Sequence, residues 1–146
     1  MCGIAGFLSR EDFSDEYWIN NLEAMASSLV HRGPDKEGIW FDRSQGIGFS
    51  HRRLSILDLT ETGNQPMHSA CNNYVITFNG EIYNHLNIRK RLEEENYITS
   101  WRGTSDTETF ISAFASWGIK KTLKESRGMF AFSVWDKRKK ELILGR

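Results

Sequence analysis

Strand-like apolar segments stand at both ends of this 146-residue chain, and helical patterns lie between them. Residues 2–8 form a short apolar run typical of a strand, and apolar residues also fill 129–135 and 142–144. The last two segments flank the charged stretch 136–140, which predicts a hairpin with a charged turn. At a length that allows about one domain, this order of elements indicates a layered α+β fold.

Three helical patterns fill the middle of the chain. In the first, apolar residues recur at spacings of three and four across 18–30. A second, weaker pattern covers 84–95, and the third begins at a capping box formed by Ser105 and Glu108 and ends at Gly118. Short strands are predicted at 38–41, 47–51 and 74–78.

Charge and cysteine content exclude several classes of protein. The 19 basic and 19 acidic residues cancel, so no charge bias favours a nucleic-acid or membrane partner. No apolar run approaches the roughly 20 residues that span a bilayer. The two cysteines, Cys2 and Cys71, lie far apart. A disulfide framework or a metal site is therefore not expected, and we expect a reducing, cytoplasmic location.

Cys2 directly follows the initiator methionine. Removal of Met1 would give one residue both a thiol and a free α-amine, whose pKa of about 8 suits it to act as a base. A terminal amine that activates its own side chain is a known form of nucleophile activation. The alternative interpretation is a small buried residue in an edge strand.

Asn79 and Gly80 follow the apolar run 74–78. An Asn side-chain amide and an unshielded Gly N–H are suitable donors for the oxyanion of an acyl-transfer reaction. Asn-Gly is also the commonest tight hairpin turn, so both interpretations stay open at this point.

Arg52 and Arg53 lie in a predicted strand, where only one of two neighbours can face a given pocket. An Arg fork suits a substrate carboxylate, although spacing alone favours a solvated surface pair. Asp106 follows a helix cap, where the helix dipole favours a negative charge; its alternative role is to hold a substrate amine. The four histidines show no ligand spacing and are interpreted as structural or surface residues: His31, His51, His68 and His85.

Six segments occur in register along almost the whole chain: Met1-Cys2-Gly3-Ile4-Ala5-Gly6, His31-Arg32-Gly33-Pro34-Asp35, Arg53-Leu54-Ser55-Ile56, Asn79-Gly80-Glu81-Ile82-Tyr83-Asn84, Ser105-Asp106-Thr107-Glu108 and Gly128-Met129-Phe130-Ala131-Phe132. Together they resemble the glutaminase domain of class II glutamine amidotransferases, most closely that of the glutamine-hydrolysing asparagine synthetases. The resemblance implies an N-terminal nucleophile hydrolase fold, an αββα sandwich of two antiparallel sheets between helical layers. We expect residues 1–146 to be this domain, C-terminally truncated within its last strands and without the ATP-dependent synthetase domain.

The resemblance also implies a reaction, the hydrolysis of the L-glutamine side-chain amide to glutamate and ammonia through a Cys2 thioester. Cys2 would be the nucleophile, and Asn79 and Gly80 would form the oxyanion hole. The substrate-binding residues would be Arg53 for the α-carboxylate, Asp106 and Glu81 for the α-amino group, and Ile56 and Leu57 at the pocket wall, together with Asn79 and Gly80.

Ammonia would then serve ATP-dependent asparagine synthesis in the attached synthetase domain. The glutaminase half is expected to need no cofactor and no metal, whereas ATP and Mg²⁺ would belong to the synthetase domain. The expected partners are L-glutamine and that domain, with a homodimer as an open assembly. Two alternatives remain: an amidotransferase with another acceptor, a sugar or a different carboxylic acid, and a non-catalytic module that binds glutamine or a partner.

Overall fold

The first half of the chain forms a three-stranded antiparallel sheet covered by one helix. The computed structural model describes residues 2–56 and 58–146. The elements of this half are β1 (Gly3–Leu8), α1 (Asp15–Ser28), β2 (Lys36–Asp42), a 3-10 turn (Arg43–Gln45) and β3 (Ile47–Arg53). The strands are ordered β1-β3-β2, so β3 is the central strand of this sheet.

The second half forms a four-stranded antiparallel sheet in the order β4-β5-β6-β7. Its strands are β4 (Met67–His68), β5 (Tyr74–Ile82), β6 (Gly128–Asp136) and β7 (Glu141–Gly145). The helices of this half are α2 (His85–Glu94), α3 (Asp106–Trp117) and α4 (Ile119–Glu125), and a 3-10 turn (Glu61–Gly63) precedes β4.

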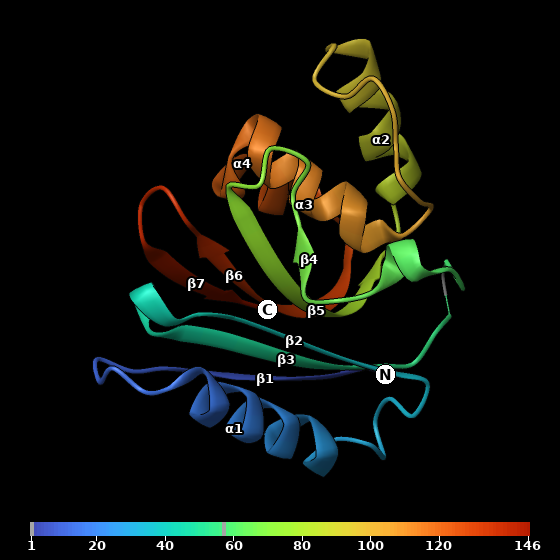
Figure 1. Cartoon of the computed structure of the whole chain (residues 1–146). Coiled ribbons are helices and arrows are strands. Elements are labelled where there is room, and N and C mark those ends of the chain that lie inside the picture. The colour runs from blue at the N-terminus through green and yellow to red at the C-terminus, as the bar shows by residue number, and fades with distance from the viewer. Residues whose placement is uncertain (1, 57) are drawn as a thin grey trace.

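The two sheets lie face to face, with α1 outside the first sheet and the other helices outside the second (Figure 1). The expected αββα sandwich is confirmed by these layers. Within the described residues, no helix is long and apolar enough to cross a membrane.

The apolar face of helix α1 packs against β3 at a glycine of that strand. Ser14 caps the helix by accepting a hydrogen bond from the N–H of Tyr17 at 3.2 Å. Trp18 and Leu22 are fully buried. A side chain at Gly48 would meet Leu22 at 2.9 Å, so the missing side chain lets the helix approach the strand.

The helices on the second sheet bury an aromatic cluster. The ring of Phe110 on α3 stands 5.6 Å from that of Phe78 on β5 and 5.4 Å from that of Phe132 on β6. Phe114 lies one turn along the helix, 4.3 Å from Phe110 between ring centroids. These apolar positions recur at helical spacing, which is why the sequence indicated α3 so clearly. Helix α4 and the short strand β4 were not predicted.

A second core lies between the sheets. Ile47 and Phe49 of β3 pack with Val75 of β5 and Trp135 of β6. Further along β3 the buried residue is His51, whose Nε2 lies 3.3 Å from the carbonyl oxygen of Phe78. The inter-sheet layer thus changes from apolar to polar towards the end of β3.

Strand β5 continues through Asn79 and Gly80, so the hairpin-turn interpretation of this dipeptide is wrong. Asn79 pairs with Ala131 and Gly80 with Phe130 in the antiparallel register with β6. Gly80 has φ of 151°, and a Cβ there would lie 2.2 Å from the carbonyl oxygen of Met129. Glycine is required at this position by both the backbone angle and the close approach of β6.

Candidate active site

A pocket of about 230 Å³ opens where the two sheets meet the start of α3. The structure brings the following predicted site residues to its wall: Cys2, Arg53, Ile56, Asn79, Gly80, Glu81 and Asp106. Leu57, also predicted to line the site, lies outside the described residues. Four elements therefore supply one pocket, because β1 begins and β3 ends beside β5, and α3 begins next to it.

Cys2 lies at the start of β1, beside the end of β3. Its Sγ accepts a hydrogen bond from the N–H of Leu54 at 3.4 Å and lies 3.7 Å from the carbonyl oxygen of the same residue. The side chain is half-buried and lines the pocket. The thiol is thus fixed by backbone contacts while one side of the residue faces open space. Cys71, in contrast, is exposed and outside the pocket lining.

Asn79 and Gly80 carry polar groups in β5 at the pocket wall. The Oδ1 atom of Asn79 is buried and has no hydrogen-bond partner within the described part of the chain. A buried acceptor without a partner is costly. The donor that an oxyanion would need is the other end of the same amide, the Nδ2 group.

Asp106 is buried at the start of α3 and closes the end of β5. Its Oδ2 accepts a hydrogen bond from the N–H of Ile82 at 2.9 Å. Burial raises the pKa of Asp106, and the bond from Ile82 opposes that rise. A cation bound in the pocket would therefore be favoured, since it would compensate the desolvation of this carboxylate. Glu81 is exposed at the same wall.

Arg52 and Arg53 point to opposite faces of β3. Arg52 pairs with Glu37 at 2.8 Å, on the face away from the pocket lining. Arg53 is buried, lines the pocket and donates from Nη1 to the carbonyl oxygen of Thr60 at 2.8 Å and to Oδ1 of Asn64 at 3.0 Å. Its Nη2 also donates to the carbonyl oxygen of Asp58. The guanidinium of Arg53 is thus oriented by the loop of residues 58–64.

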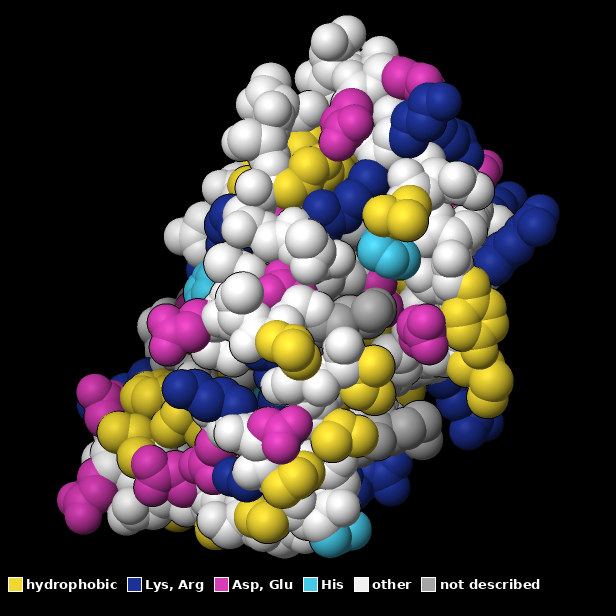
Figure 2. All heavy atoms as spheres, turned by 90° about the vertical axis from the view of Figure 1, so that its right-hand side faces the viewer, with side chains coloured by type: hydrophobic (Ala, Val, Ile, Leu, Met, Phe, Trp, Pro, Cys, Tyr) yellow, Lys and Arg dark blue, Asp and Glu magenta, His cyan; other side chains and the backbone are white. Residues whose placement is uncertain are grey.

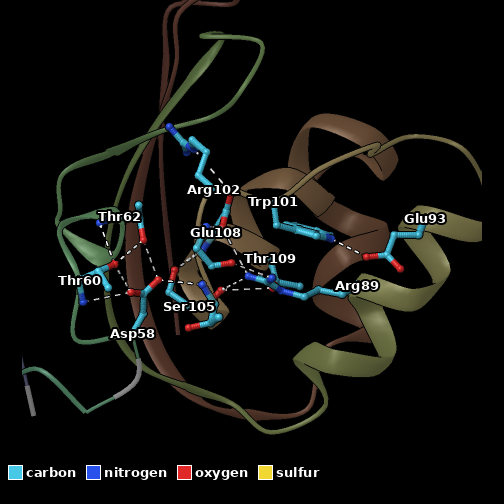
Figure 3. Close-up of polar contacts among 12 residues, drawn as sticks. Asp58, Thr60, Thr62, Arg89, Glu93, Trp101, Arg102, Ser105, Glu108 and Thr109 are labelled. Carbon is cyan, nitrogen blue, oxygen red and sulfur yellow. Dashed lines mark hydrogen bonds and ion pairs between the residues drawn. The ribbon is translucent and has the colours of Figure 1, made fainter.

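That loop is fastened to the segment before α3 through Asp58 (Figure 3). Oδ2 of Asp58 accepts from the N–H of Thr104 at 2.8 Å and from Oγ1 of Thr62 at 2.9 Å. Burial by itself would raise the pKa of Asp58, but the hydrogen bonds from Thr60, Thr104 and Thr62 together lower it to about 2. Asp58 therefore stays ionised and links the loop that orients Arg53 to the residues just before Asp106.

Glu108 and Arg89 hold the other side of the same segment (Figure 3). The carboxylate of Glu108 accepts from the N–H groups of Arg102 at 2.8 Å and Gly103 at 3.0 Å. Arg89 on α2 donates to the carbonyl oxygens of Gly103 and Ser105, both at 2.9 Å. The start of α3, and with it Asp106, is fixed by buried charges from two helices.

The structure adds residues that the sequence did not single out for the site. Gln65 lines the pocket and is buried, and Asp58 organises the loop beside it. His51, interpreted as structural or surface, is buried behind the pocket. No local signal marks Gln65 or Asp58, because their contacts join residues distant in sequence. Among residues 2–56 and 58–146, no group of three or more His, Cys, Asp or Glu side chains could hold a metal ion.

The surface around this end of the molecule has a mixed character. Figure 2 shows acidic, basic and hydrophobic side chains interspersed over the face on the right-hand side of Figure 1. Neither sign of charge dominates that face. This agrees with the balanced composition of 19 basic and 19 acidic residues.

The layered sandwich is shared with a solved protein, the glutamine phosphoribosylpyrophosphate amidotransferase of Bacillus subtilis. That structure matches with a TM-score of 0.50 over 63% of this chain and 21% of its own, at 22% identity. The family model described as a glutamine amidotransferase domain matches residues 1–146. The chain belongs to this family.

Curated relatives extend the comparison. The chain is 38% identical to asparagine synthetase [glutamine-hydrolyzing] 1 of Bacillus subtilis over 94% of its length. It is 34% identical over its full length to the amidase chry2 of Gibberella zeae. It spans only 21% and 22% of these two proteins. The chain therefore corresponds to about a fifth of each relative.

Proposed function

We propose that this domain hydrolyses the side-chain amide of L-glutamine to glutamate and ammonia. The observation that carries the proposal is the convergence of Cys2, Asn79, Gly80, Arg53 and Asp106 on one pocket, although they come from four separate parts of the chain. Glutamine presents an amide, a carboxylate and an ammonium group. The pocket offers a thiol with nearby donors, a cation and anions, which matches each of these groups in turn.

In the proposed first step, the sulfur of Cys2 attacks the amide carbon and the carbonyl oxygen takes up the negative charge. The Asn79 amide and the Gly80 N–H donate to this oxygen. The α-amine of Cys2, freed by removal of Met1, accepts the thiol proton and passes it to the leaving nitrogen. The C–N bond breaks, ammonia departs and a thioester remains. Water then attacks the thioester, which restores the thiol and releases glutamate.

Substrate orientation follows from charge. The guanidinium of Arg53 is proposed to bind the α-carboxylate, and Asp106 with Glu81 to bind the α-amino group, while Ile56 and Leu57 contribute the wall. Because both charged ends would be paired, an analogue that lacks one of them should bind poorly, since the matching buried charge would lose its partner. No cofactor is needed for this hydrolysis.

The ammonia is proposed to serve the ATP-dependent synthesis of asparagine in a further domain, which would use ATP and Mg²⁺. The asparagine synthetases among the relatives, of which this chain spans about a fifth, support that assignment. A second candidate, an amidotransferase with a different acceptor, is favoured by the amidases chry2 and chyE, which match at 34% and 35% identity. Both candidates share the same glutaminase step.

The proposal is tested by replacing the nucleophile in the complete polypeptide. Cys2→Ala should lower ammonia release from glutamine by at least about a thousandfold, because the thioester cannot form. Cys2→Ser, with a weaker nucleophile of similar shape, should also be severely impaired. The measurement is ammonia release with glutamine as substrate, and the mass of the purified protein checks that Met1 has been removed.

Cys71→Ala is the matched control, since Cys71 is an exposed thiol outside the pocket lining. It should leave ammonia release unchanged. Full activity in Cys2→Ala would refute the proposed mechanism. Retention of Met1 in an active protein would refute the role of the α-amine.

A further inference from the structure

The outer edge of β5 loses its strand partner before it reaches the pocket. β4 pairs with β5 only at Met67↔Ile76 and His68↔Val75. The backbone groups of Phe78 on this edge therefore need other hydrogen-bond partners, because buried N–H and C=O groups are rarely left unpaired. Phe78 is buried and directly precedes Asn79. The groups that bond to the backbone of Phe78 therefore also fix the position of Asn79.

The side chain of Gln65 takes the place of the missing strand. Its Oε1 accepts a hydrogen bond from the N–H of Phe78 at 2.6 Å, and its Nε2 lies 3.4 Å from Oγ1 of Thr107. Gln65 is only 8% exposed. One buried amide thus joins the residue before Asn79 to the residue after Asp106.

Gln65 and Phe78 are each held from a second side. A Cβ on Gly38 of β2 would lie 2.0 Å from the carbonyl oxygen of Gln65, so the backbone of Gln65 rests directly on that glycine. The carbonyl oxygen of Phe78 lies 3.3 Å from Nε2 of His51, which donates when it carries the ring proton. Side chains therefore hold both backbone groups of Phe78.

The same edge of β5 carries the Gly80 N–H. N–H groups two residues apart in a strand point to the same edge. On one side of Gly80 the N–H of Phe78 donates to Gln65, and on the other side the N–H of Ile82 donates to Asp106. The Gly80 N–H, between them, faces the pocket that Gly80 lines. A shift of Phe78 would move this donor and the neighbouring Asn79 together.

We propose that Gln65 is a positioning residue, which holds β5 so that Asn79 and Gly80 are aimed at the oxyanion of the reacting amide. The inference rests on the proposed function and extends it to a residue that does not itself take part in bond making. Donors must be placed to within a fraction of an ångström to act in the transition state, and a misplacement of about 1 Å can cost a hundredfold in rate. Arg53 and Asp106, which are proposed to bind the charged ends of glutamine, do not depend on so exact a position of β5. Substrate binding should therefore be less sensitive to Gln65 than the rate of the chemical step.

The test is the steady-state kinetics of glutamine hydrolysis by Gln65→Met in the complete polypeptide. Methionine keeps the length of the side chain and removes both hydrogen bonds. We expect kcat to fall about tenfold to a hundredfold while KM stays within about threefold, the pattern of an interaction made in the transition state. The rate at which iodoacetamide alkylates Cys2, which uses no oxyanion hole, should stay within about twofold of the unsubstituted protein.

Two further variants complete the design. Gln45→Met is the matched control, because Gln45 lies outside the pocket lining and its side chain, within residues 2–56 and 58–146, donates to Ser44; its kinetics should be unchanged. Thr107→Val removes the second partner of Gln65 with little change in volume. It should lower kcat in the same direction but less, and it decides the matter if Gln65→Met does not fold.

The outcomes separate the two proposals. Unchanged kcat in folded Gln65→Met, or in Thr107→Val where the first does not fold, overturns the positioning role and leaves the glutaminase function standing. A rise in KM at constant kcat also overturns it, since Gln65 would then act in binding. Equal losses in turnover and in Cys2 alkylation would indicate general damage and overturn it as well. Absence of ammonia release from the unsubstituted protein refutes the proposed function, and this inference falls with it.

Discussion

His51 is a buried histidine between the two sheets, 1% exposed and in contact with the carbonyl oxygen of Phe78. Burial lowers its pKa from the ordinary 6.5 to about 4; the contact with Phe78 opposes this, and the charge of Arg53 adds to it. The folded protein therefore holds the neutral ring. Because the imidazole touches the residue just before Asn79, its protonation would disturb both the inter-sheet layer and the site.

This gives a signed prediction for acid stability. Between pH 6.5 and 4 the unfolded chain binds a proton that folded His51 does not, so the free energy of unfolding falls as the pH is lowered through that window. The loss should total roughly 3 kcal/mol and level off below about pH 4. Urea denaturation of His51→Gln at several pH values should show this part of the slope removed. His31→Gln, at an exposed histidine, should keep the slope; an equal slope in both would contradict the assignment.

At the scale of elements, the site depends on how the segment before α3 is fastened. The sequence predicted a capping box, and half of it forms, since Ser105 Oγ accepts from the N–H of Glu108 at 3.2 Å. The carboxylate of Glu108 does not return to Ser105 but accepts from Arg102 and Gly103. It thereby fixes the segment that also receives the Asp58 loop.

Removal of Glu108 should therefore cost more than loss of a helix cap. Glu108 and Arg89 form a buried ion pair, with side chains 6% and 11% exposed. Glu108→Ala leaves Arg89 buried without that partner and should lower the free energy of unfolding by about 3 kcal/mol. Glu94→Ala, which breaks the exposed pair with Lys90, should cost less than about 1 kcal/mol. Urea denaturation measures both, and equal losses would show that burial does not matter here.

At the scale of the whole molecule, β5 serves two cores and the pocket. One face packs against the helices through Phe78, and the other packs against the first sheet through Val75. The strand then leaves the apolar layers and enters the pocket at Asn79. The rigidity of the site therefore derives from two hydrophobic cores on opposite sides of a single strand.

The aromatic cluster gives the prediction at this scale. Phe110 is fully buried, and its ring lies within 5.6 Å of four other phenylalanine rings between centroids. Phe110→Ala should lower the free energy of unfolding by about 3–5 kcal/mol, through lost burial and the cavity left behind. Leu86→Ala, at a leucine 68% exposed, should change it by less than about 0.5 kcal/mol. A small loss in Phe110→Ala would mean that the helices collapse onto the sheet without that ring.

The sequence by itself determined most of the helices and strands, α4 and β4 excepted, and the residue types that the proposed site offers. Apolar spacing within a few residues fixes α1 and α3, and the residue types at Cys2, Arg53 and Asp106 already match the groups of glutamine. These are properties of a residue and its near neighbours, so they can be recognised without knowing the fold.

Only the tertiary structure decided which of the open interpretations holds at each position. Asn79 and Gly80 lie in a strand because β6 pairs with β5 along its full length. Their partners in β6 are some fifty positions away in the sequence. Gln65 and Asp58 gain their importance in the same way, since their partners, Phe78 and Thr104, come from other segments. These side chains bond to backbone N–H groups that no neighbouring strand pairs. Which N–H groups are left unpaired is decided only when the sheets assemble.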